Sequence, residues 1–120
     1  MVDLESLSRI VSLLNRLDER LKDAQSVGLS EAVVLNALGR GIPSPSEIAA
    51  ATGIGASNLS RLLKALEERG LVERNIDDKD KRRFRFALTP AGHETLVAVE
   101  GSRLEVPKEL LGAYEALGKG

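Results

Sequence analysis

Hydrophobic residues recur at helical spacing over the first 25 positions. Aliphatic side chains three and four residues apart predict one long helix with an apolar stripe along one side: Leu7, Ile10, Leu14, Leu17 and Leu21. Asp3 is expected to cap this helix and Gly28 to end it. A second helix is predicted from a cap at Ser30 to the glycines at positions 39 and 41.

The clearest local signal lies at positions 44–47, Ser-Pro-Ser-Glu. A serine followed three residues later by glutamate is a capping box, and proline suits the first helical position. This pattern predicts a short helix that ends at Gly53. After a glycine-containing turn, four leucines at positions i, i+3, i+4 and i+7 predict another helix, closed by Gly70: Leu59, Leu62, Leu63 and Leu66.

The period then changes from 3.6 to 2, which predicts strands over 71–76 and 83–88 joined by a charged loop. In the second strand, phenylalanine and leucine side chains face one side, and Arg83 and Arg85 the other. Thr89 and the proline after it predict a helix over about 90–102. Pro107 begins a last helix, which we expect Gly112 to interrupt.

Two short helices joined by a glycine turn and followed by a hairpin predict a winged helix-turn-helix. The fold class is therefore mostly α with a small β-hairpin wing (α+β). The length of 120 residues, 42% of them hydrophobic and 29% charged, suits a single globular domain over 1–120.

Composition excludes most catalytic and metal chemistry. The chain has no cysteine and one histidine, His93, so thiol nucleophiles, disulfides and cysteine-ligated metals are excluded. No nucleophile–base pair or carboxylate dyad stands at usable spacing, so we expect no enzyme, no metal and no cofactor. No basic segment precedes an apolar core after Met1, and no apolar run approaches the ~18 residues of a membrane span. We therefore expect a cytoplasmic protein with no membrane partner.

The net charge of −1 hides an uneven distribution. Residues 54–93 carry nine basic and six acidic side chains, whereas residues 94–120 carry three basic and five acidic ones. A basic middle segment in an otherwise acidic chain indicates a polyanion as partner for that segment.

The helix after the glycine turn would be the recognition helix. Opposite its leucine stripe, the N-terminal half offers polar and basic side chains: Ser57, Asn58, Ser60, Arg61 and Lys64. Arginine and asparagine read guanine and adenine through paired hydrogen bonds, and lysine neutralises phosphate. A plain solvated helix face would carry the same residue types, so this pattern alone leaves both interpretations open.

The loop and second strand form the other candidate DNA contact. Five of the seven residues from 79 to 85 are basic: Lys79, Lys81, Arg82, Arg83 and Arg85. Such a run is often only a solvated hairpin tip, but here it stands where a wing belongs, and arginine is favoured in a narrow minor groove. The loop's aspartates could suggest a calcium site, but the spacing lacks the glycine and glutamate of an EF-hand loop.

From about Leu29 to Leu96 the sequence resembles the MarR family of transcriptional regulators. The resemblance is strongest at Gly70-Leu71-Val72-Glu73-Arg74, at Asp80-Lys81-Arg82, and at Ala87-Leu88-Thr89-Pro90-Ala91-Gly92. These are similar to the three ordered parts of the family's signature. In that pattern Asp80 and Arg82 match a wing salt-bridge pair, whose arginine reaches the minor groove.

The resemblance implies a regulator, expected to be a repressor, that binds a pseudo-palindromic operator in double-stranded DNA as a homodimer. Residues 1–27 and 103–120 would be dimerisation helices around a core over 29–102. The stripe of the first helix and four residues of the last would form the dimer interface: Leu7, Ile10, Leu14, Leu17, Leu21, Leu110, Leu111, Tyr114 and Leu117. Many relatives respond to small aromatic acids, so an unidentified small aromatic effector is a further implied partner.

One alternative stays open. A winged helix can act purely as a protein-protein interaction module without specific DNA binding. Such domains often lose basic residues from the recognition face, whereas Arg61, Lys64 and Arg82 are present here.

Overall fold

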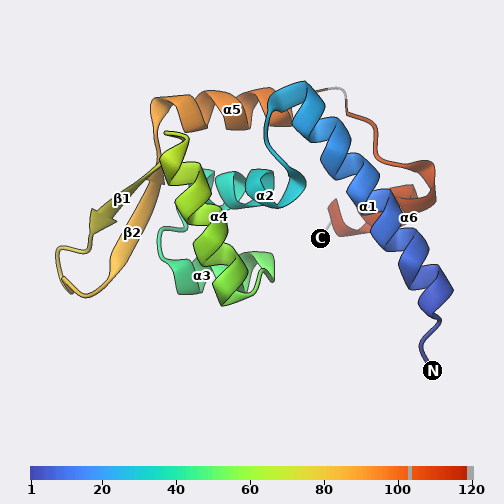
Figure 1. Cartoon of the computed structure of the whole chain (residues 1–120), viewed down its shortest axis with the longest axis horizontal. Coiled ribbons are helices and arrows are strands. Elements are labelled where there is room, and N and C mark those ends of the chain that lie inside the picture. The colour runs from blue at the N-terminus through green and yellow to red at the C-terminus, as the bar shows by residue number, and fades with distance from the viewer. Residues whose placement is uncertain (103, 119–120) are drawn as a thin grey trace. The chain divides into compact units, whose positions relative to one another are not determined.

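The computed structural model describes residues 1–102 and 104–118. Their order is α1 (Leu4–Gln25), α2 (Leu29–Gly39), α3 (Pro45–Thr52), α4 (Ala56–Glu68), β1 (Val72–Ile76), β2 (Phe84–Leu88), α5 (Pro90–Glu100) and α6 (Lys108–Gly118) (Figure 1). The chain divides into two compact units: Met1–Leu29 with Ser102–Gly120, and Ser30–Gly101. The mostly helical fold with a two-stranded antiparallel hairpin is the winged helix that the sequence predicts.

The first unit contains α1, whose ends are set by side-chain and backbone caps. Asp3 accepts hydrogen bonds from the backbone N–H groups of Glu5 and Ser6 at 3.1 and 3.3 Å, as predicted. The helix does not run to Gly28. Ser26 adopts the left-handed conformation with φ 64°, and its N–H closes the last turn on the Lys22 carbonyl at 2.9 Å.

The start of α2 also differs from the prediction. Leu29 is already helical, and its N–H donates to the carboxylate of Asp18 at 2.6 Å. The capping group therefore comes from α1, eleven residues earlier in the chain, and Ser30 lies inside α2 and does not cap it.

The last helix, α6, also belongs to the first unit. It continues through Gly112, so the predicted interruption there is wrong. A Cβ at this glycine would meet no heavy atom within 4 Å, so the space around this position is open. Residues 103, 119 and 120 of the predicted C-terminal segment lie outside the described residues.

The second unit has a core built from three helices. Ser44 caps α3 by accepting from the N–H of Glu47 at 3.3 Å, and Gly53 ends α3 with φ 75°, both as predicted. Side chains from α2, α3 and α4 are almost wholly buried in this core: Val34, Leu35, Ile48, Leu59, Leu63 and Leu66. These apolar contacts fix α4 by its leucine face and so determine which side chains α4 exposes.

The hairpin of β1 and β2 projects from the helices of its unit (Figure 1). Its register pairs Val72 with Leu88 and Ile76 with Phe84. The outer edge of β2 has one further bond, from the N–H of Phe86 to the carbonyl of Pro43 at 2.8 Å. That bond ties the hairpin to the segment that leads into α3.

The junction between hairpin and α5 explains two residues of the third signature stretch. The Thr89 hydroxyl accepts from the N–H of Gly92 at 3.0 Å and donates to the carbonyl of Gly70 at 2.6 Å. Gly92 is buried, and a Cβ there would lie 1.9 Å from the carbonyl oxygen of Leu71. Thr89 thus caps α5 and links it to the turn that follows α4. Gly92 permits the close approach of α5 to the Leu71 carbonyl.

Candidate nucleic-acid interface

The exposed face of α4 carries all five predicted recognition residues. Burial of Leu59, Leu63 and Leu66 at 2% exposure or less turns the opposite side of the helix to solvent. The five side chains on that side are exposed: Ser57, Asn58, Ser60, Arg61 and Lys64. The guanidinium of Arg61 donates to the amide oxygen of Asn58, so the arginine and asparagine one turn apart are joined.

The N-terminal end of α4 begins without a side-chain cap. Gly55 occupies the N-cap position, and it has no hydroxyl or carboxylate to accept from the first turn. A Cβ at Gly55 would meet nothing within 4 Å, so the space around it is open. Exposed N–H groups at a helix start suit an anionic oxygen such as that of a phosphate.

Aspartates shape the tip of the wing from within. Asp77 accepts from the N–H of Lys79 at 2.8 Å, and Asp80 from the N–H of Arg82 at 3.1 Å. The backbone of Arg83 closes the loop through bonds of 3.0 Å to both Asp77 and Asp80. The acidic residues therefore form turns of the Asx kind. Within 1–102 and 104–118, no three acidic or histidine side chains gather in a way that could hold a metal ion.

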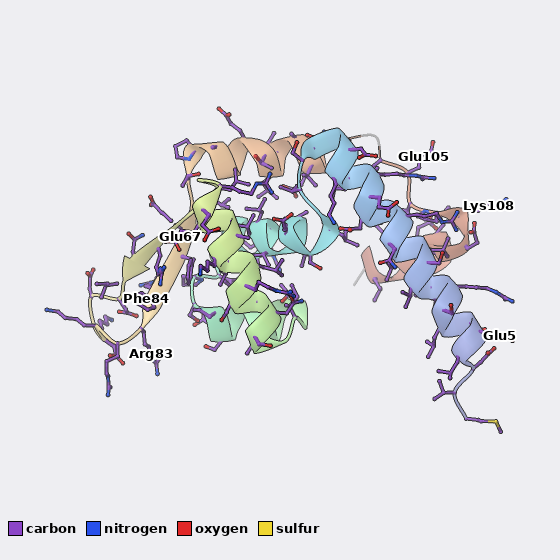
Figure 2. All side chains as sticks on the ribbon, viewed as in Figure 1. Glu5, Glu67, Arg83, Phe84, Glu105 and Lys108 are labelled. Atoms are coloured by element: carbon purple, nitrogen blue, oxygen red, sulfur yellow. The ribbon has the colours of Figure 1, made fainter. Side chains whose placement is uncertain are left out.

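The cations of the wing point into solvent. Arg82 and Arg83 are 92% and 77% exposed, and their Nε atoms lie 3.2 and 3.5 Å from the two carboxylate oxygens of Asp80. The N–H of Arg82 and then its guanidinium lower the pKa of Asp80 below its ordinary value. One carboxylate is thus shared by two arginines. Lys79, Lys81 and Arg85 are exposed as well, so the tip stays basic; Arg83 lies towards that tip in Figure 2.

A groove of about 260 Å³ separates α4 from the wing. Its lining combines apolar side chains with two cations and one carboxylate: Pro45, Ser60, Leu63, Lys64, Glu67, Arg74, Phe84 and Phe86. Across it, Arg74 of β1 donates to both carboxylate oxygens of Glu67 on α4, at 2.9 and 3.3 Å. The same guanidinium lies 4.9 Å from the ring centre of Phe84 on β2.

Sequence reasoning missed this Glu67–Arg74–Phe84 cluster. The sequence pattern assigns no role to Glu67 or Phe84, and Arg74 appears in it only as part of the family signature. The strand pattern places Arg74 and Phe84 on one face once the register is known, since 74 pairs with 86. The pairing register of β1 and β2 cannot be read from the strand pattern alone, because it depends on the length of the loop between the two strands.

The predicted dimer residues belong to the first unit and differ in exposure. Leu7, Ile10 and Leu14 of α1 are 46%, 42% and 40% exposed, whereas Leu17 is half-buried and Leu21 is buried within the single chain. On α6, Leu110 is half-buried, and the other three are exposed: Leu111, Tyr114 and Leu117. Two helices therefore present uncovered apolar side chains in the single chain.

Among the described residues, no helix combines the length and the apolar character that crossing a membrane requires. His93 is exposed on α5. Neither observation adds a second candidate site.

Known proteins match the chain in sequence and in fold. The model of the MarR family matches residues 26–83. The transcriptional repressor MprA of Escherichia coli is 33% identical over 85 residues, which are 67% of this chain and 48% of MprA. The chain thus spans about half the length of this curated relative.

Solved structures share the whole fold. The transcriptional regulator BldR from Sulfolobus solfataricus superposes with a TM-score of 0.74 at 22% identity, over 98% of this chain and 93% of that one. A mutant of MarR from E. coli, complexed with operator DNA, superposes with a TM-score of 0.71 at 23% identity. The match covers 95% of this chain and 91% of that one. The family is one of transcriptional regulators and not of enzymes. By the matched family model, the similarity to MprA and the shared fold, the chain belongs to the MarR family of winged helix-turn-helix transcriptional regulators.

Proposed function

We propose that this chain is a cytoplasmic transcriptional repressor that binds a pseudo-palindromic operator in double-stranded DNA as a homodimer. One observation carries the proposal. In one compact unit, an exposed polar and basic face of α4 stands next to a wing whose cations point into solvent. The names of the relatives support it, since MprA is a repressor and the E. coli MarR mutant was solved with operator DNA.

Each side chain has a distinct role in the proposal. Arg61, near the start of the recognition helix, reads a base edge in the major groove, and Lys64 contacts phosphate. Arg82 enters the minor groove, and Asp80 holds it in place through the 3.2 Å ion pair. The remaining polar and basic residues position the backbone: Ser57, Asn58, Ser60, Lys79, Lys81, Arg83 and Arg85.

The homodimer is proposed from the apolar faces of the first unit. Residues 1–27 and 103–120 supply the dimerisation helices, and residues 29–102 the DNA-binding core. A two-fold interface covers exposed aliphatic side chains such as Leu7 and Leu14. It also provides two recognition helices for half-sites about one turn of DNA apart. A small aromatic effector that lowers operator affinity completes the proposal, as the resemblance to the family implies.

A salt titration on the operator tests the proposal. Operator candidates are inverted repeats in the DNA upstream of the gene for this chain. Six to ten phosphate contacts lower the affinity by roughly 10³–10⁵ between 50 and 200 mM salt. Measured by fluorescence anisotropy, a steep dependence supports the DNA-binding function. A flat dependence contradicts it and favours the protein-interaction module.

A further inference from the structure

We infer that Glu67, Arg74 and Phe84 form a clamp that sets the position of the wing relative to the recognition helix. The inference rests on the proposed function, because a fixed wing matters for binding two adjacent grooves of DNA. Arg74, although basic and beside the DNA-binding residues, is a positioning residue in this account and does not contact the phosphates.

The three residues come from three elements that the chain must hold together. Glu67 lies in the last turn of α4, Arg74 on β1 and Phe84 on β2; Figure 2 shows Glu67 at the end of α4 that adjoins the hairpin. Arg74 joins them through two hydrogen bonds to one carboxylate, at 2.9 and 3.3 Å, and through its stacking on the Phe84 ring at 4.9 Å. A planar guanidinium can make both contacts at once.

The clamp spans a groove that is not filled by other side chains. The hollow of about 260 Å³ between α4 and the hairpin is lined by all three residues. Phe84 is 43% exposed, so apolar packing holds this part of the wing only in part. Hydrogen bonds of Thr89 and Phe86 also hold the hairpin, but they lead to Gly70 and Pro43 and not to α4 itself. Arg74 pairs with Phe86 in the register, and Phe84 lies two residues further towards the tip. The directional contacts of Arg74 therefore link the hairpin directly to α4.

The guanidinium of Arg74 already has an ion-pair partner within the protein, the carboxylate of Glu67. Its two hydrogen bonds to Glu67 make a close ion pair, in which Arg74 is 44% and Glu67 31% exposed. In contrast, Arg82 is 92% exposed. A phosphate contact by Arg74 would have to replace Glu67 as partner, whereas a positioning role keeps the pair intact.

A distance measurement without DNA tests the clamp directly. Because the chain has no cysteine, Glu68→Cys on α4 and Asp78→Cys in the wing loop place spin labels at two defined positions of each chain. Dilution with unlabelled protein removes distances between the two chains of a dimer. We expect double electron–electron resonance to give a narrow distance distribution for the labelled parent protein. The substitutions Arg74→Ala and Glu67→Gln should each broaden that distribution. Arg74→Lys broadens it too, because an ammonium cannot make the paired and stacked contacts of a guanidinium.

The matched control is Arg69→Gln. Arg69 forms an ion pair of 3.3 Å with Glu31 and is 40% exposed, so the control removes the same charge from an ion pair in the same unit. It leaves the hairpin untouched, and the distribution should stay narrow. A width that does not change in Arg74→Ala overturns the clamp, whether or not the protein binds DNA.

A second arm measures operator affinity against salt. We expect Arg74→Ala and Arg74→Lys to lower specific affinity by a factor of about 3–10, the scale of one exposed ion pair and one stacked cation. The slope of log K against log salt should equal that of the parent protein. A slope that falls by about 0.9 for each arginine removed marks Arg74 as a phosphate contact and overturns the positioning role. A parent protein that binds no DNA refutes the proposed function, and the distance measurement then decides the clamp alone.

Discussion

Gly92 lies at the first turn of α5, directly over the carbonyl of Leu71. The position is helical, so its backbone needs no glycine for conformational reasons; the need is for space, because a Cβ would lie 1.9 Å from that oxygen. Backbone atoms move less readily than the end of a side chain. Because the side chain of glycine is a single hydrogen atom, α5 can begin at the Thr89 cap without a clash with the Leu71 carbonyl.

A pair of identical substitutions tests this point. Gly92→Ala should lower the free energy of unfolding by about 1–3 kcal/mol, because the added methyl group must displace the Leu71 backbone. Gly112→Ala, in a helix with open space around it, should raise it by about 0.5–1 kcal/mol through helix propensity. Urea unfolding at fixed protein concentration measures both. Equal effects of the two substitutions would contradict the steric account.

Arg61 and Lys64, one turn apart on α4, are expected to differ in what they recognise. Arg61→Ala should cost about 1–3 kcal/mol on the cognate operator and little on random duplexes, since a lost base contact affects specific binding. Lys64→Ala should weaken both duplexes by the same factor, because phosphates are alike in every sequence. Competition titrations with the two duplexes give the ratios. Arg61 has no base-reading role if its substitution lowers both affinities equally.

At the scale of elements, the caps show what the sequence can and cannot reveal. Ser44 and Thr89 cap the helices that follow them directly, so their role is visible in a few adjacent letters. The cap of α2 comes from Asp18, and the partner of Glu67 is seven residues away on a strand. Contacts between residues on different elements depend on how the intervening loop places one element against the other, and the adjacent sequence does not reveal this. The predicted helices and strands were therefore largely right, whereas the cap at Ser30 was wrong and the Glu67–Arg74–Phe84 cluster was missed.

The cap by Asp18 has a pH signature. The hydrogen bond from the N–H of Leu29 is the largest cause that lowers the pKa of Asp18 below its ordinary value, and Lys22 lowers it further through the 3.1 Å ion pair. Because the folded-state pKa is the lower one, the ionised carboxylate stabilises the fold fully above about pH 4. That contribution is lost as the pH falls through the folded-state pKa.

Two substitutions of Asp18 separate cap from charge. Asp18→Ala should destabilise the protein at pH 7 by about 0.5–2 kcal/mol, the range for a lost helix cap. Asp18→Asn keeps an acceptor oxygen and should destabilise it less. Urea unfolding from pH 7 down to pH 2.5 should show the difference between the parent protein and the asparagine variant shrinking below pH 4. A difference that is constant over this range would argue against an ionised cap.

At the scale of the whole molecule, the apolar stripes of α1 and α6 determine whether binding is bivalent. Leu14 lies in the middle of the α1 stripe and is 40% exposed in the single chain. A charge there would be buried without a partner in a two-fold interface, which is costly. The winged unit has its own core and does not include Leu14.

Leu14→Glu should therefore convert the dimer to monomers while leaving the helices formed. Operator affinity should fall towards the level of random DNA, because each monomer keeps the contacts of one half-site. Val33→Glu, at a residue of α2 that is 37% exposed and outside the predicted interface, is the matched control and should stay dimeric. Light scattering and circular dichroism measure the two effects. A parent protein that is monomeric at tens of micromolar would remove the paired operator from the proposal.

The bond between Phe86 and Pro43 has a consequence for association between molecules. Each outer edge of a two-stranded hairpin can template a strand from another chain and so start aggregation, and the Phe86 bond lies on the outer edge of β2. At Phe86 that edge is taken by a proline carbonyl, and proline has no N–H with which to continue a ladder. An incoming strand would have to displace this contact and would meet a residue that cannot pair further. The wing can thus extend into solvent, as DNA contact requires, without offering neighbouring molecules an open strand edge at this point.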